Sequence, residues 1–135
     1  MTSVSLELQG AIVKRLKEFA PLTLLVDQRV YDDVPAGAAM PYVSLGPDQV
    51  VSDNVECIDG YEITIQIDAW SVTKGLPEVK KVAEAVRQAL NAYDLPLADN
   101  ALVSIEHRQT RNLRDPDGVT NHAVIEFVAI VEQPS

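Results

Sequence analysis

The most regular stretch of this sequence is Tyr61-Glu62-Ile63-Thr64-Ile65-Gln66-Ile67-Asp68-Ala69-Trp70. Isoleucine or alanine occupies every second position from Ile63 to Ala69, and polar residues lie between them. A period of two residues sends alternate side chains to opposite faces, so the stretch predicts an antiparallel strand that is buried on one face. That face needs a covering layer, which we expect from helices elsewhere in the chain.

Helical periodicity on both sides of this strand predicts two amphipathic helices. The first covers about Ser5–Phe19 and ends before Pro21. The second covers about Pro77–Tyr93, with Pro77 at the first helical position, where its missing N–H is not needed. The apolar stripes are Leu8, Ile12, Leu16 and Phe19 in the first helix, and Val79, Val82, Val86, Leu90 and Tyr93 in the second.

The C-terminal part predicts a β-hairpin that pairs Ala101–Arg108 with His122–Glu132. Its turn is Asp115-Pro116-Asp117-Gly118, whose residue types suit a type I turn followed by a glycine in the left-handed region. The resulting bulge sets a register that faces His107 with Phe127 and Asp115 with Val119. On one face that register gathers Val103, Ile105, Phe127, Ala129 and Val131.

Together with a strand that starts near Pro41, these elements predict an α+β fold. We expect a mainly antiparallel four-stranded sheet with two helices packed on one face, in the order α-β-β-α-β-β. A length of 135 residues and a hydrophobic content of 47% indicate one domain over residues 1–135. The apolar run Leu22–Val26 is too short to classify by periodicity.

The last predicted strand is apolar on both faces. Val124, Val128 and Ile130 alternate with the residues that face the core. In a small domain with helices on one side of a sheet, the second face is normally exposed to water. Either the Leu22–Val26 segment or a partner subunit is therefore expected to cover it.

Charge and composition exclude several classes of protein. The 11 Lys and Arg against 20 Asp and Glu give a net charge of −9, which argues against a protein that grips nucleic acid. The single cysteine, Cys57, rules out an internal disulfide and a cysteine-based zinc site. No apolar run approaches the ~20 residues needed to span a bilayer, so no membrane association is expected. The first residues, Met1–Glu7, lack the pattern of a signal peptide.

Residues that could support catalysis or bind a cofactor are few. No glycine-rich phosphate loop precedes either helix. His107 is expected to be a structural histidine, and Cys57 lies in an acidic stretch that would raise a thiol pKa rather than activate it. The acidic residues Asp48, Asp53, Glu56 and Asp59 lack the spacing of a calcium loop. We therefore predict no catalytic residue, no cofactor and no metal.

The end of the predicted hairpin carries positively charged residues, in contrast to the negative net charge of the chain. Residues 108–121 read as a long polar loop, either a docking arm or solvated hairpin decoration. Arg108 is expected opposite Glu126 as a cross-strand pair, and arginine suits contacts between proteins. The candidate interface therefore consists of Arg108, Arg111, Arg114, Asp115, Asp117, Val124, Val128 and Ile130.

The order of several short motifs is familiar. They are Arg29-Val30-Tyr31-Asp32-Asp33-Val34-Pro35, Met40-Pro41-Tyr42-Val43-Ser44-Leu45-Gly46, Ile67-Asp68-Ala69-Trp70-Ser71 and Arg114-Asp115-Pro116-Asp117-Gly118-Val119-Thr120-Asn121-His122. With the helices around them, they resemble the tail-completion or tail-terminator proteins of long-tailed bacteriophages and gene transfer agents. The resemblance spans nearly the whole chain and brings no catalytic motif with it.

The resemblance implies a structural virion protein with one tail-terminator-like domain. Such proteins form a homo-oligomeric, hexameric ring that caps the tail tube and joins it to the head. The expected partners are the tail tube protein and a head–tail connector protein, and DNA would pass through the ring without specific binding. The expected location is the virion tail or neck, after assembly in the bacterial host cytoplasm. Two alternatives remain: a neighbouring connector or adaptor of the same assembly, and a small ligand-binding or enzyme domain with a pocket between sheet and helices.

Overall fold

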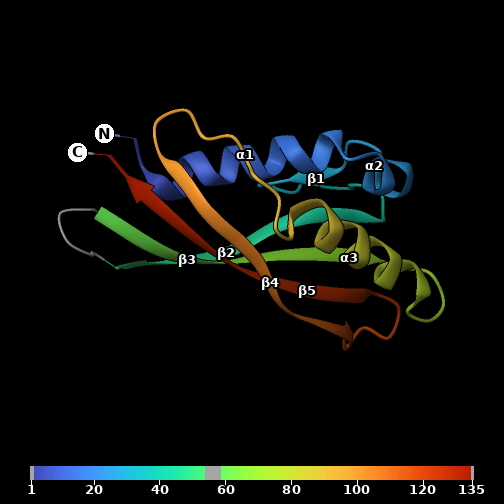
Figure 1. The fold of residues 1–135 in the computed structure, drawn as a ribbon. Coiled ribbons are helices and arrows are strands. Elements are labelled where there is room, and N and C mark those ends of the chain that lie inside the picture. Colours follow the sequence, from blue (N-terminus) through green and yellow to red (C-terminus); the bar gives the residue numbers. More distant parts are fainter. Residues whose placement is uncertain (1, 54–58, 135) are drawn as a thin grey trace.

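The computed structural model describes residues 2–53 and 59–134. Within these ranges, three helices lie on one side of a single five-stranded sheet of order β1-β2-β3-β5-β4 (Figure 1). The elements are α1 (Val4–Glu18), α2 (Ala20–Val26), β1 (Val30–Tyr31), β2 (Tyr42–Ser52), β3 (Asp59–Ser71), α3 (Pro77–Leu90), β4 (Ala101–Arg114) and β5 (Asn121–Gln133). The predicted sheet of four strands with two helices is therefore wrong.

The added helix and strand come from the segment that periodicity could not classify. Phe19 has an extended backbone that ends α1, and Pro21 then lies in the first turn of α2 rather than after the last helix of the region. The two residues of β1 pair in parallel with Val43 and Ser44 of β2, which makes the sheet mixed. A strand of two residues has no measurable period, so no sequence pattern announces it.

The alternating stretch of β3 behaves as predicted and lies at the centre of the sheet, between β2 and β5. Ile63, Ile67 and Ala69 are fully buried, and Ile65 is nearly so. The predicted stripes of α1 and α3 also reach the core, apart from Tyr93. That residue lies beyond the end of α3, where the guanidinium of Arg15 stacks 3.5 Å from its ring centre.

The hairpin of β4 and β5 is longer than predicted. His107 does face Phe127, but the backbone N–H of Asp115 donates to the carbonyl of Thr120, so Asp115 does not face Val119. The reason is a bulge between His107 and Gln109, which shifts the register by one residue toward the turn. A second bulge displaces Val103 from the core face and leaves it 57% exposed.

The face of the sheet opposite the helices, called the open face below, carries no helix among the described residues. Residues Leu22–Val26 lie in α2, which packs against α1 and α3 on the helical side. The expectation that this segment covers the second face of β5 is therefore wrong. Figure 1 shows α1 and α2 at the top of the view and α3 across the right-hand part of the sheet, with no helix below β4 and β5. The described helices therefore leave the open face uncovered.

Helix α2 provides a matched test of the packing. Leu22 is fully buried and Leu24, two residues away, is 86% exposed. We expect Leu22→Ala to lower the free energy of unfolding by about 2–5 kcal/mol, because it leaves a cavity in the core. Leu24→Ala should change that energy by less than about 0.5 kcal/mol. Urea unfolding of both variants measures the difference, and equal values would show that α2 is not packed as described.

Candidate assembly interface

A row of aromatic side chains crosses one end of the open face. The rings of Trp70 and His122 stack with centroids 3.7 Å apart and planes 8° apart. The ring of Tyr42 lies 6.4 Å from Trp70 on the other side, and Tyr31 meets Tyr42 edge-on at 5.7 Å. The indole N–H of Trp70 donates to the hydroxyl of Ser44 at 3.0 Å. The row thus runs over four strands, from β1 to β5.

A buried carboxylate fixes this row from the side. Asp68 is only 6% exposed, and its Oδ1 lies 2.7 Å from Nε2 of His122, an ion pair whenever the histidine is protonated. The side-chain amide of Gln66 also donates to Asp68, at 3.0 Å. At Gly46 on the neighbouring strand, an added Cβ would lie 2.7 Å from Oδ2 of Asp68. The absence of a side chain at position 46 therefore leaves room for the carboxylate.

The sequence pattern did not bring these residues together, because cross-strand neighbours depend on register. Trp70 faces His122 and Asp68 faces Val124 only once β3 and β5 are paired. Two of the motifs that carry the family resemblance contain Trp70 and His122, but no sequence pattern indicated that these two residues form a site. The sequence signal was the alternation itself, which places Asp68 and Trp70 on the face away from the core.

The three apolar candidates of β5 lie on the open face and are not part of the hydrophobic core cluster. Val124 is buried between Asp68 and Arg111 in its row, whereas Val128 and Ile130 are half-buried. Their lateral neighbours are polar: Thr64 and Glu106 beside Val128, Glu62 and Ser104 beside Ile130. The open face is thus a polar surface with separate apolar positions rather than one apolar patch.

The three arginine candidates lie on strand β4 and not on a loop. Arg108, Arg111 and Arg114 are all exposed, and only residues 115–120 connect β4 to β5. The expected pair of Arg108 with Glu126 is wrong, because the bulge puts Gln109 opposite Glu126. The amide of Gln109 donates to that carboxylate at 2.6 Å. The expected polar loop of residues 108–121 is therefore a short turn on a long ordered hairpin.

The turn is held by its own aspartates. One carboxylate oxygen of Asp117 accepts the backbone N–H groups of Val119 and Thr120, at 2.9 and 2.8 Å, and the other accepts the hydroxyl of Thr120 at 2.6 Å. The Thr120 hydroxyl, followed by these N–H groups, lowers the pKa of Asp117. The N–H of Gly118 donates to the carbonyl of Asp115, and Gly118 has the expected positive φ of 76°. Asp117 is thus engaged within its own turn.

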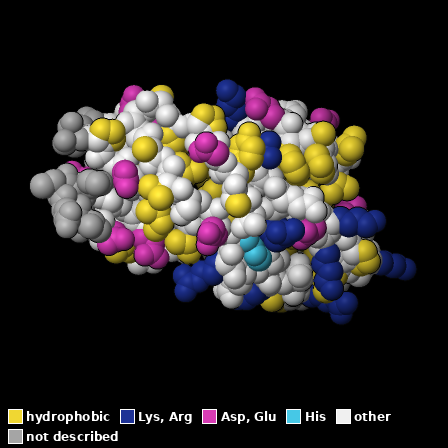
Figure 2. Space-filling view, in the orientation of Figure 1, with side chains coloured by type: hydrophobic (Ala, Val, Ile, Leu, Met, Phe, Trp, Pro, Cys, Tyr) yellow, Lys and Arg dark blue, Asp and Glu magenta, His cyan; other side chains and the backbone are white. Residues whose placement is uncertain are grey.

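Charge is divided between the two ends of the molecule. Figure 2 shows Lys and Arg gathered around the lower right, where β4 and β5 meet in Figure 1, and Asp and Glu more frequent toward the other end. Toward that other end lie Asp53, Asp59, Glu62 and Glu132, whereas Asp48 lies at the middle of the β2–β3 pair. The net charge of −9 is therefore unevenly distributed, with positive charge concentrated at one end of the molecule.

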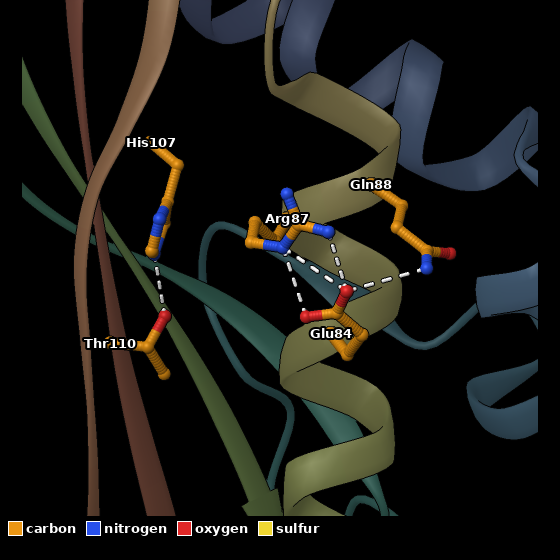
Figure 3. A network of polar contacts seen from close by, with 5 residues as sticks. All are labelled: Glu84, Arg87, Gln88, His107 and Thr110. Carbon is orange, nitrogen blue, oxygen red and sulfur yellow. Dashed lines mark hydrogen bonds and ion pairs between the residues drawn. The ribbon is translucent and has the colours of Figure 1, made fainter.

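A separate polar cluster lies between α3 and β4 (Figure 3). The guanidinium of Arg87 bonds the carboxylate of Glu84 at 2.6 Å, which lowers the pKa of Glu84. On β4, Nε2 of His107 lies 2.7 Å from the hydroxyl of Thr110. The ring of His107 also meets Phe127 edge-on, with centroids 5.7 Å apart. His107 is thus packed as a structural histidine.

The described residues contain no group of three His, Cys, Asp or Glu side chains placed to hold a metal ion. Cys57 and Glu56 lie outside the described residues, so the predictions about them are not addressed by the structure. A cleft of about 110 Å³ separates α1 from β2, lined by Leu8, Ile12 and Leu45 among others. Wider, more open depressions of about 330–400 Å³ lie elsewhere on the described surface, one of them between α1 and residues 93–98. None of the described helices is long and apolar enough to cross a membrane.

Comparison with known proteins gives a consistent result. The family model described as "Tail completion protein gp17" matches residues 10–132. The tail completion protein gp17 of Bacillus phage SPP1 is 27% identical over 118 residues, which is 87% of each chain. A chain from the virion of a native gene transfer agent particle is 32% identical, with a TM-score of 0.91 over 98% of this chain and 99% of that one. The structure of bacteriophage SPP1 gp17 shares the fold, with a TM-score of 0.64 and 24% identity over 93% and 88%.

These similarities define a class: a structural subunit of phage virions and gene transfer agent particles, and not an enzyme. Within that class, the chain belongs to the family of tail completion proteins gp17. The resemblance seen in the sequence is thereby confirmed, and the place of the protein is the tail or neck of the particle.

The turn of the β4–β5 hairpin leads to a pH-dependent prediction. Because the pKa of Asp117 is lowered in the folded state, its contribution to stability is present above the ordinary pKa of 3.8 and is lost as the pH falls through the lower folded value. Asp117→Ala should therefore lower the thermal midpoint at about pH 7, and the difference from the unmodified protein should shrink toward about pH 3. A difference that is constant with pH, followed by calorimetry, would contradict this origin.

Proposed function

We propose that this tail completion protein forms a homo-oligomeric ring, of six copies, that caps the tail tube and provides the surface that joins the head. The observation that carries the proposal is the open face: a sheet face on which none of the described helices packs, in a chain of a virion family. An antiparallel sheet tolerates one face in water, so the open face remains available for contact with another subunit.

The proposed partners are the tail tube protein on one side of the ring and a head–tail connector protein on the other. The genome would pass through the ring without specific binding. The net charge of −9 favours passage over retention, because binding of nucleic acid relies on cations that neutralise phosphates.

The proposed contact residues fall into two groups on the hairpin of β4 and β5. The exposed cations of β4 lie at one end of the molecule and can reach a neighbouring subunit or the tube without a change in the fold. The β5 side chains lie on the open face beside them. The full set is Arg108, Arg111, Arg114, Asp115, Asp117, Val124, Val128 and Ile130.

Electron microscopy of the purified protein, alone and mixed with purified tail tubes, tests the proposal directly. We expect rings, free or bound at one end of the tubes, and tubes that stop growing when the protein is added. Protein that binds head connectors but never tube ends would instead make it a neighbouring connector. Protein that forms no ring under either condition contradicts the proposal.

The arginines of β4 provide a variant test. We expect Arg111→Gln combined with Arg114→Gln to leave the thermal midpoint of the subunit nearly unchanged, since both side chains are exposed. If each arginine contributes about 0.2–1 kcal/mol per contact, assembly should require a concentration about 2- to 30-fold higher. The loss should be greater at low salt, where such contacts are least screened.

The matched control is Lys80→Gln combined with Lys81→Gln. These two exposed lysines lie on α3, on the helical side, and the substitution removes the same charge. The control should assemble like the unmodified protein. Equal weakening by both double variants, measured by sedimentation, would mean that net charge rather than the β4 arginines controls assembly.

A further inference from the structure

Two edges of the sheet carry unpaired backbone groups. On one side, β1 pairs only with Val43 and Ser44, which leaves the outer edge of β2 free beyond them. On the other side, β4 is the last strand of the sheet. The loop after α3 covers the middle of β4, where Ala92 donates to the carbonyl of Ile105 and Asn91 accepts from the N–H of His107. The part of β4 beyond His107 is exposed.

The hydrogen bonds at each hairpin end determine which backbone groups point outward. In an antiparallel pair, successive residues alternate between bonding the partner and facing away. Since Asp115 bonds Thr120, the residues of β4 that face away from β5 are Thr110, Asn112 and Arg114. Since Asp53 bonds Gly60, the residues of β2 that face away from β3 are Asp48, Val50 and Ser52. None of the hydrogen bonds between described residues occupies these six backbone N–H groups.

We infer that copies of this chain join edge to edge, residues 110–114 of β4 in one copy pairing antiparallel with residues 48–52 of β2 in the next. This inference rests on the proposed ring and names the contact that builds it. The two strands run in opposite directions within one sheet, so a neighbouring copy in the same orientation presents β2 antiparallel to β4. Each segment offers three outward residues over the same length.

Electrostatic interactions favour this contact between β4 and β2 over a symmetric contact between two β4 edges. Two β4 edges facing each other would bring together six arginines, and like charges on paired strands are destabilising. The β2 segment instead carries Asp48 and is followed by Asp53. When Val50 faces Asn112, Asp48 lies opposite Arg114 and Asp53 lies near Arg108. A contact between two different edges is head-to-tail, which is the kind that generates rings.

The faces of the sheet agree with this register. Val50 lies on the helical face because it faces Ile63, and Asn112 lies on the same face because it faces Ala123. Pairing them continues the sheet with all helices on one side and all open faces on the other. Within one chain, however, the residue of β4 that lies in register with Val50, through Ile63 and Ala129, is Ile105. Ile105 precedes Asn112 by seven residues along β4. Each contact therefore adds a stagger along the strands, which a sheet needs in order to close on itself.

Proline substitutions can block the two edges separately, because proline lacks the outward N–H and is tolerated at strand edges. Asn112→Pro blocks the β4 edge and Val50→Pro blocks the β2 edge; Asn112→Ala and Val50→Ala are the matched controls that keep the N–H. We expect each proline variant to fold with a thermal midpoint close to that of its control. Each should need at least a tenfold higher concentration to assemble, whereas the controls assemble normally.

Mixing the two proline variants gives the decisive result. Such a mixture retains one intact contact, between the free β4 edge of one variant and the free β2 edge of the other. We expect heterodimers by native mass spectrometry, although neither variant alone forms dimers or rings. Rings formed by both proline variants, with normal rings of the unmodified protein, would overturn the edge contact and leave the proposed ring intact. No ring of the unmodified protein, with or without tail tubes, would overturn both.

A cross-linking measurement covers the case in which a proline variant does not fold. A benzoylphenylalanine at position 112, in a mixture of isotope-labelled and unlabelled copies, should cross-link to residues 48–53 of a different copy. Cross-links between copies that map to other segments of assembled rings would overturn the pairing.

Discussion

The structure depends on the burial of one face of β3. Its alternating isoleucines and Ala69 lie under the helices, and the two neighbouring strands follow the same alternation. Because side chains of a strand alternate strictly, filling this face with apolar residues sends Glu62, Gln66 and Asp68 to the other side. The same constraint that builds the core therefore also creates a polar face that the described helices do not cover.

The periodic elements could be predicted from the sequence, and the irregular ones could not. The strand around Ile65 and the two long helices each repeat their hydrophobic pattern several times. The period of that pattern alone therefore predicts whether each segment is a strand or a helix. Helix α2 has seven residues and β1 has two, and their type is decided by Phe19, Pro21 and the pairing with β2. Tertiary contacts of this kind leave no period in the sequence.

The candidate interface shows the same division. Exposure of the β4 arginines followed from their polar surroundings, but their place on a strand depends on the bulge at Arg108, which no residue type announces. The aromatic row required the register of four strands. The order of short motifs nevertheless carried the family resemblance, which the match of the family model to residues 10–132 confirms.

The stacking of Trp70 on His122 has a practical consequence for studying this protein. Trp70 is the single tryptophan of the chain, so the intrinsic fluorescence excited in its absorption band comes from one known position on the open face. Indole emission responds to the polarity around the ring, and a protonated imidazole in contact with the ring quenches it. The molecule thus contains its own optical probe, which reports contact with the open face without a label.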